Sequence, residues 1–123
     1  MKKQTVLVVD DAPENIDVLH GILNERYAIK AATSGEVAMK IVKSEEPPDI
    51  ILLDIVMPGM SGYDVRDAVK GDMATAHIPI VYVTGNEMTR NGEIPPGVEG
   101  FLRKPVEPGE LLSLVERLLR TRT

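Results

Sequence analysis

Short runs of apolar, mostly β-branched residues alternate with amphipathic stretches, and this alternation limits the folds open to the chain more than any other feature. The segments TVLVVD, YAIKAA, PPDIILLD, IPIVYVTG and GFLRKP are expected to be strands, at residues 5–10, 27–32, 47–54, 78–85 and 100–105. Several are apolar at consecutive positions, which is typical of strands buried on both faces. The pattern therefore predicts an α/β fold, with a parallel sheet covered by helices on both sides.

The segments between the strands have apolar residues at helical spacing. Helices are expected within residues 12–25, 34–45, 62–72 and 107–123. Ser34 is a candidate N-cap, and Gly71 lies near the end of the third helix. The stretch before the last strand contains NG at 91–92 and PP at 95–96, which break helices. A further helix there is expected to be short or irregular, over about residues 87–90.

The composition excludes several classes of function. The 123 residues are enough for one domain. The chain has no cysteine, so it has no disulfide, no cysteine-ligated zinc and no catalytic thiol. A net charge of −5 argues against direct nucleic-acid binding by this domain. The first apolar run is cut by Asp10 and is too short for a signal peptide or a membrane span, so we expect a cytoplasmic protein with no membrane contact.

Polar residues gather where the predicted strands end. Ligands of open parallel sheets bind beyond the carboxyl ends of the strands. The residues found there are three carboxylates, one hydroxyl and one ammonium group: Asp10, Asp11, Asp54, Thr84 and Lys104. Each has an ordinary explanation taken singly, since Asp11 could cap a helix, Asp54 could sit in a turn, Thr84 could end a strand and Lys104 could be a solvated loop residue. Their convergence at one end of one sheet favours a functional site.

The chemistry of this set points to phosphoryl transfer. Three crowded carboxylates repel one another and need a cation. Oxygen ligands without cysteine favour a hard metal, Mg²⁺ before Ca²⁺. A lysine supplies a positive charge for phosphate oxygens, and an aspartate can attack phosphorus to form an acyl phosphate. Together these groups predict a site at which an aspartate is phosphorylated.

Four segments carry a resemblance to a known family: VVDD at residues 8–11, LLDIVMPGMSGYD at 52–64, IPIVYVTG at 78–85 and FLRKP at 101–105. In this order and spacing they resemble the receiver domain of two-component response regulators. The resemblance spans essentially the whole chain, which is expected to be a single receiver domain over residues 1–123. It implies a flavodoxin-like, doubly wound, five-stranded parallel sheet with the strand order 2-1-3-4-5.

The resemblance also implies roles for individual residues. Asp54 matches the phosphoacceptor, and Lys104 matches the lysine that binds the phosphoryl group. Asp11 matches a direct Mg²⁺ ligand, Asp10 acts largely through water, and the backbone carbonyl of Val56 is a further ligand.

The signalling roles are implied in the same way. Thr84 and Phe101 match the pair that switches on phosphorylation, and Lys104-Pro105 matches a cis peptide bond. The implied partner is a sensor histidine kinase or a phosphotransfer protein, and a homodimer or effector contact is expected through the last strand and the last helix. We expect no enzymatic activity beyond self-phosphorylation and slow autodephosphorylation. The autodephosphorylation is expected to be slow because apolar Val56 cannot position an attacking water. Asn86 is the second residue expected to tune the lifetime of the phosphoryl group.

Two alternatives bear on this interpretation. The main one is a receiver-fold interaction module that signals without phosphorylation, and the complete set of site residues argues against it. An FMN-binding module would need a hydroxyl-rich loop in place of DDAPEN at residues 10–15.

The last helix has a wide apolar arc, which has two interpretations, burial in the core or a partner surface. The arc consists of Leu111, Leu112, Leu114, Val115, Leu118 and Leu119.

Overall fold

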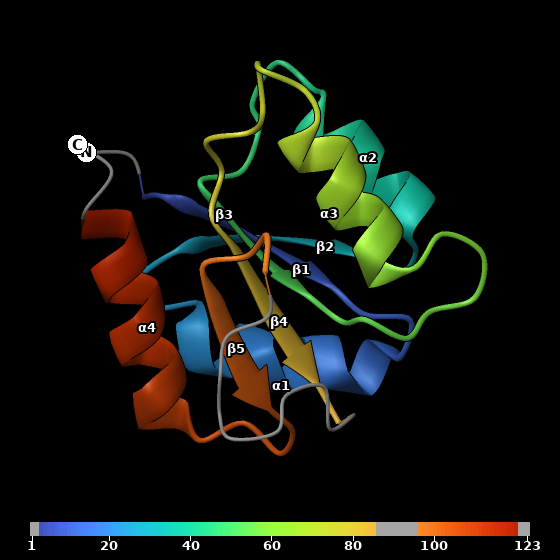
Figure 1. Cartoon of the computed structure of the whole chain (residues 1–123). Coiled ribbons are helices and arrows are strands. Elements are labelled where there is room, and N and C mark those ends of the chain that lie inside the picture. Colours follow the sequence, from blue (N-terminus) through green and yellow to red (C-terminus); the bar gives the residue numbers. More distant parts are fainter. Residues whose placement is uncertain (1–2, 86–95, 121–123) are drawn as a thin grey trace.

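The computed structural model of the chain describes residues 3–85 and 96–120 (Figure 1). The strands are β1 (Thr5–Val9), β2 (Ala28–Ala32), β3 (Ile50–Leu53), β4 (Ile80–Thr84) and β5 (Gly100–Arg103). The helices are α1 (Pro13–Leu23), α2 (Gly35–Val42), α3 (Gly62–Lys70) and α4 (Pro108–Arg120). The short helix expected at residues 87–90 and the tuning residue Asn86 lie outside the described residues.

The five strands form one parallel sheet in the order β2-β1-β3-β4-β5. This confirms the predicted fold class and strand order. The central strands β1, β3 and β4 are buried almost throughout, as their continuous apolar runs predicted. Strand β2 is more polar and lies at one edge, and the short β5 lies at the other.

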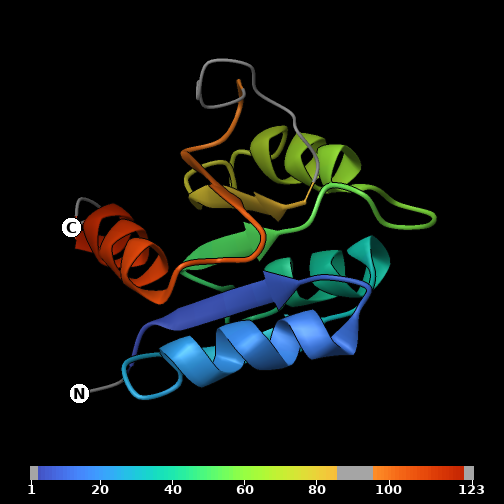
Figure 2. The same ribbon diagram turned by 90° about the horizontal axis from the view of Figure 1, so that it is seen from below.

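Among the described residues, helices α2 and α3 cover one face of the sheet, and α1 and α4 cover the other (Figures 1 and 2). Helices α2 and α3 pack against the core formed by Leu7, Val9, Ile51, Leu53 and Tyr82, among others. Helices α1 and α4 close the opposite core, which includes Val6, Val8, Ile50 and Leu52. Successive strand residues thus point to opposite layers, which explains why these strands are apolar at every position.

Helix α4 uses its wide apolar arc mainly for burial. Leu111, Val115 and Leu119 are buried, while Leu112, Leu114 and Leu118 are half-buried and pack against the same core. All six leucine and valine residues of the arc therefore contribute to the fold, and a partner surface on this helix stays a prediction. None of the helices within residues 3–85 and 96–120 is both long and apolar enough to cross a membrane.

The helix ends follow the expected capping in most places. The Ser34 side chain accepts a hydrogen bond from Val37 N at the start of α2, and Ser61 forms a capping box with Asp64 at the start of α3. The alternative that Asp11 caps α1 is wrong. The N-cap of α1 is Ala12, without a side-chain cap, and Asp10 Oδ1 accepts from Ala12 N at 2.9 Å.

Candidate functional site

Two of the predicted carboxylates lie side by side because their strands are neighbours. Val9 pairs with Leu53 in the sheet, so the next residues, Asp10 and Asp54, leave the strands at the same level. Their backbones are fixed by the last ladder bonds, in which Asp10 N donates to Ala32 O and Asp54 N donates to Val9 O. The parallel pairing of β1 and β3 thus brings together two acids that are far apart in the sequence.

Asp11 completes a cluster of three carboxylates. One carboxylate oxygen from each of Asp10, Asp11 and Asp54 lies within 4.8 Å of the others. Asp10 and Asp54 are 2% and 7% exposed, whereas Asp11 is open to solvent. The cluster has a buried floor and an accessible side, and its oxygen donors fit a hard divalent cation such as Mg²⁺.

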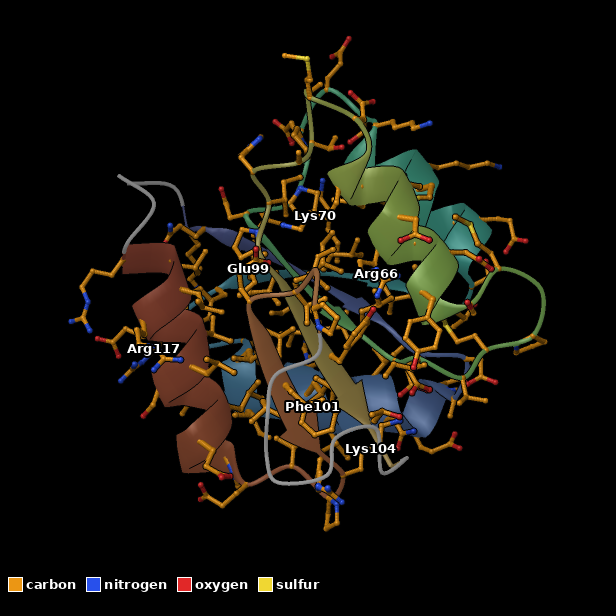
Figure 3. All side chains as sticks on the ribbon, viewed as in Figure 1. Arg66, Lys70, Glu99, Phe101, Lys104 and Arg117 are labelled. Carbon is orange, nitrogen blue, oxygen red and sulfur yellow. The ribbon has the colours of Figure 1, made fainter. Side chains whose placement is uncertain are left out.

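Lys104 brings a positive charge into this cluster from the end of β5 (Figure 3). Its Nζ lies 2.6 Å from Asp10 Oδ2 and 3.6 Å from Asp54 Oδ2. Its backbone N donates to Thr84 O at 3.0 Å, which ties the end of β5 to the end of β4. The peptide bond between Lys104 and Pro105 is cis, as the resemblance implied.

The surroundings raise the pKa of Asp54 above its ordinary value. The main cause is burial, which disfavours the charged carboxylate, and the charges of Asp10 and Asp11 act in the same direction. The Lys104 ammonium and a hydrogen bond from the Ile55 backbone oppose the increase in this pKa. The charged form of Asp54 is therefore destabilised in the protein without metal, and a bound cation would stabilise it.

This pKa shift predicts how stability depends on pH without metal. The folded-state pKa of Asp54 lies above its ordinary value of 3.8, so the folded state binds the proton more tightly. Stability is therefore lost as pH rises from about 3.8 through the raised pKa. In EDTA at pH 7, Asp54→Asn should unfold at a higher temperature than wild type, and the difference should narrow as the pH falls. Thermal melts from pH 7 to 5 measure this, and a variant less stable than wild type at pH 7 would contradict it.

The predicted switch residues Thr84 and Phe101 lie on the neighbouring strands β4 and β5 and differ in their burial. Thr84 ends β4 and is 1% exposed. Phe101 is half-buried, pairs in register with Tyr82, and packs against the core under α2 and α3. The Arg103 guanidinium lies 6.0 Å from the centre of the Phe101 ring. Tyr82, the neighbour of Phe101, is fully buried and packs edge-on against Tyr63 of α3.

The loop after Asp54 leaves the site open on one side. Val56 is 60% exposed, whereas Met57 is buried and holds the loop to the core. Gly59 has a φ of 72°, a conformation that favours glycine, so the Pro-Gly sequence makes the tight turn here. The Val56 side chain is therefore open to solvent, and the metal-ligand role of its carbonyl stays a prediction.

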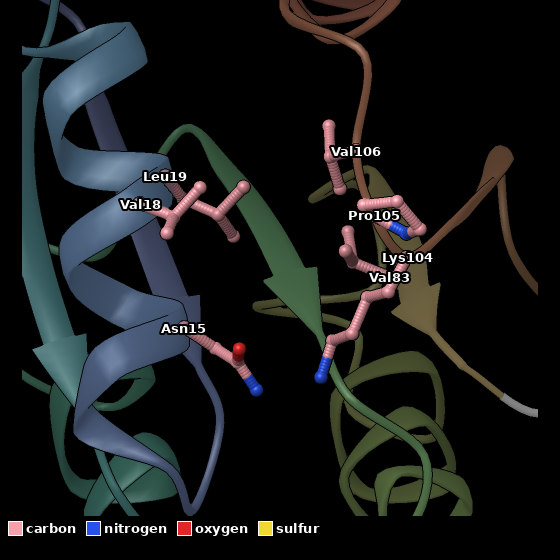
Figure 4. A pocket seen from close by; sticks show the side chains of 7 residues that line it. All are labelled: Asn15, Val18, Leu19, Val83, Lys104, Pro105 and Val106. Carbon is pink, nitrogen blue, oxygen red and sulfur yellow. The ribbon is translucent and has the colours of Figure 1, made fainter.

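A surface hollow adjoins the site (Figure 4). It has a volume of about 370 Å³ and lies between α1 and the segment after β5. Its lining is mainly apolar: Asn15, Val18, Leu19, Val83, Lys104, Pro105 and Val106. Val18 is 57% exposed on α1. The hollow therefore combines an exposed apolar wall with the lysine of the site.

Gly62 is a positioning residue that the sequence analysis missed. Its N–H donates to Ile55 O at 2.9 Å, and a Cβ added there would lie 2.7 Å from Ile55 Cα and still closer to Asp54 O. The first turn of α3 is thus packed directly on the backbone of Asp54. A glycine at the first helical position, where its propensity is poor, was the available signal.

A family model described as the response regulator receiver domain matches residues 6–116. The chain belongs to this family. The receiver domain matches several curated proteins and solved structures over nearly all of its length, and the shared region includes the site residues.

Three similar proteins illustrate how much of a relative's length this chain covers. A Vibrio cholerae serotype O1 protein named "Probable cyclic di-GMP phosphodiesterase" is 40% identical over 120 residues, covering 96% of this chain but 27% of the relative. A two-component response regulator of Oryza sativa subsp. japonica is 36% identical, covering 94% of this chain and 88% of the relative. The crystal structure of a response regulator receiver protein from Pseudomonas putida has a TM-score of 0.82 at 30% identity, covering 95% and 98% of the two chains. The receiver domain thus spans about a quarter of the Vibrio relative.

Proposed function

We propose that this receiver domain is a phosphorylation-controlled switch that accepts a phosphoryl group on Asp54 from a histidine kinase or a phosphotransfer protein. The observation that carries the proposal is the placement of Lys104. Its Nζ reaches both Asp10 and Asp54, at 2.6 and 3.6 Å, so a cation stands beside the acceptor carboxylate. No such contact is needed by a module that signals without phosphorylation, and that alternative has no separate support.

The acid cluster fits Mg²⁺. Asp10, Asp11 and Asp54 supply hard oxygen donors within 4.8 Å of one another, with one open side. We propose Asp11 as the direct ligand, Asp10 as a ligand through water, and Asp54 and the Val56 carbonyl as the remaining contacts. The bound ion supplies positive charge that stabilises the phosphoryl oxygens during transfer.

The residues of the chain perform the remaining work. An Asp54 Oδ attacks phosphorus, the P–N bond of the phosphohistidine breaks, and the imidazole leaves with the electron pair and is protonated by solvent. Lys104 holds an oxygen of the moving group and neutralises its charge. The Thr84 hydroxyl then binds the phosphoryl group and Phe101 follows it, which biases the domain between two states.

The experiment that tests this function is intact mass spectrometry after incubation with acetyl phosphate, with Mg²⁺ or with EDTA. We expect one phosphoryl adduct, formed only with Mg²⁺. Acetyl phosphate is a small phosphodonor that releases acetate, so it tests the chemistry of the site without a cognate kinase. A wild-type chain that stays unmodified with Mg²⁺ would favour the phosphorylation-independent module.

Val56 predicts a long-lived phosphoryl group. Its side chain, two residues after Asp54, is apolar and exposed and offers no hydrogen bond to an attacking water. Val56→Asn should speed loss of the phosphoryl group by about tenfold, because an amide can orient the water. The decay of the adduct mass after removal of acetyl phosphate measures this rate. Val56→Ala is the control and should decay like wild type, and an unchanged rate in Val56→Asn would contradict the prediction.

We propose that the phosphohistidine-bearing protein packs on the hollow beside Lys104. A donor must approach Asp54 from outside the sheet, and the exposed Val18 and the apolar wall after β5 adjoin that route. Val18→Asp should slow phosphorylation by a histidine phosphotransfer protein by about tenfold or more, since a charge would be buried at the contact. Phosphorylation by acetyl phosphate should stay unchanged. Equal transfer rates from the protein donor in both chains would exclude this surface.

A further inference from the structure

Lys104 lies at the carboxyl end of the pair formed by β4 and β5. A second polar cluster lies at the opposite end of this strand pair (Figure 3). Lys70, the last residue of α3, donates from Nζ to Ala76 O at 3.1 Å, to Ile78 O at 2.8 Å and to both Glu99 carboxylate oxygens at 3.1 and 3.2 Å. We call Lys70, Glu99 and the backbone groups that they bind the clamp.

Glu99 joins the clamp to the sheet. Its Oε1 accepts from Ile80 N at 2.7 Å, and its own N donates to Ile80 O at 2.9 Å. The first residue of β4 is therefore bonded twice to the residue just before β5. An exposed ion pair alone contributes little to stability, so the importance of the clamp lies in the backbone groups that it pairs.

Strand β5 needs such an anchor because it is a short edge strand. It pairs with β4 through four residue pairs, from Val81 with Gly100 to Thr84 with Arg103. A slip of one residue would turn every β5 side chain to the opposite face and carry Lys104 away from the site. The Glu99–Ile80 bonds fix this register just before the first pair of the ladder.

Helix α3 links the clamp to the acceptor. Its first residue, Gly62, packs on the backbone of Asp54, and its last residue, Lys70, holds Glu99. Nine helical residues span about 13 Å. The helix therefore sets the position of Asp54 at one end and the register of the strand that carries Lys104 at the other.

We infer that Lys70 and Glu99 are positioning residues for phosphoryl transfer, acting through the register of β5 on Lys104. The inference rests on the proposed function, because the role of Lys104 is part of it. The hydrogen bonds of Lys70 and Glu99 go to Ala76, Ile78, Ile80 and each other, and none reaches the acid cluster, so the effect of these residues must pass through β5.

Variants at the clamp test the inference by intact mass with acetyl phosphate and Mg²⁺. Glu99→Ala and Lys70→Met should each slow adduct formation by about three- to tenfold, as expected for one or two lost hydrogen bonds. Glu99→Gln keeps an oxygen for Ile80 N and should restore most of the rate. Glu116→Gln removes the negative charge from the exposed ion pairs of Glu116 with Arg26 and Arg120 and is the matched control, with a wild-type rate expected.

A double-mutant cycle separates positioning from general destabilisation. In a Lys104→Ala background, the clamp variants should cause no further loss, because their effect acts through Lys104. Circular dichroism checks that each variant is folded at the assay temperature. Two results would overturn the inference while leaving the proposed function intact. One is a wild-type rate in both clamp variants. The other is that the clamp substitutions slow the Lys104→Ala chain by the same factor as they slow the wild-type chain.

Hydrogen exchange provides a readout that does not depend on phosphorylation. The β5 amides of residues 101–103 and the Lys104 amide just after the strand should exchange about tenfold faster in Glu99→Ala and Lys70→Met, with β1 amides unchanged as the internal reference. Unchanged β5 exchange would overturn the inference even if the wild-type chain forms no adduct. Absence of the wild-type adduct alone would count against the proposed function.

Discussion

Asp54→Asn is expected to abolish the Mg²⁺-dependent phosphoryl adduct, with a rate lower by about a thousandfold or more. The neutral amide is a poor nucleophile for phosphorus and forms no stable acyl phosphate. The substitution leaves Asp10, Asp11 and Lys104 in the chain, so loss of the adduct reports on the nucleophile and not on the other groups of the site. Intact mass after incubation with acetyl phosphate and Mg²⁺ measures the result.

The matched control is Asp17→Asn, which makes the same chemical change on the exposed face of α1. It should be phosphorylated at the wild-type rate. An adduct on Asp54→Asn that forms as fast as on wild type would mean that another residue accepts the phosphoryl group. Peptide mapping after borohydride reduction would then locate that residue.

Gly62→Ala is expected to have the largest effect among substitutions that leave every charged group in place. The added Cβ would lie 2.7 Å from Ile55 Cα and closer to Asp54 O, and these backbone atoms cannot turn aside as a side chain could. Either α3 or the Asp54 backbone must shift, which should cost about 1–3 kcal/mol of unfolding free energy. Urea unfolding measures this loss, and adduct formation should slow because Asp54 is displaced.

Gly21→Ala provides the opposite control. Gly21 lies within α1, and nothing stands within 4 Å of a Cβ added there. Alanine is the better helix former by about 1 kcal/mol, so this variant should be slightly more stable than wild type. If Gly62→Ala also gained stability, the close packing of α3 on the Asp54 backbone would be wrong.

The fold was predictable because its pattern is local. Consecutive apolar residues in residues 5–10, 47–54 and 78–85 can be buried only by a sheet covered on both faces, and the helical spacing between them supplies the covering layers. Ser34 and Gly71 occupy the predicted positions at helix ends. The strand order was implied by the resemblance to receiver domains, since pattern alone does not say which strands are neighbours.

The site was predictable as a set of residues but not as a geometry. Sequence placed Asp10, Asp11, Asp54, Thr84 and Lys104 at strand ends, and the parallel sheet brings strand ends together. It did not indicate that Lys104 pairs more closely with Asp10 than with Asp54, or that Asp10 binds the Ala12 backbone. The Asp11 cap was wrong because capping propensity considers only neighbours in sequence, whereas Asp10 reaches the same turn from the end of β1.

By itself, the sequence determined which residues are strand, helix and candidate chemistry, because backbone propensity, apolar periodicity and side-chain type are properties of short segments. Only the tertiary structure decided which distant groups meet. Three features depend on the packing of helices and strands against one another: the closeness of Gly62 to the Asp54 backbone, the burial that raises the pKa of Asp54, and the clamp of Lys70 on Glu99. Such contacts join residues far apart in the chain, and no local pattern records the distance between them.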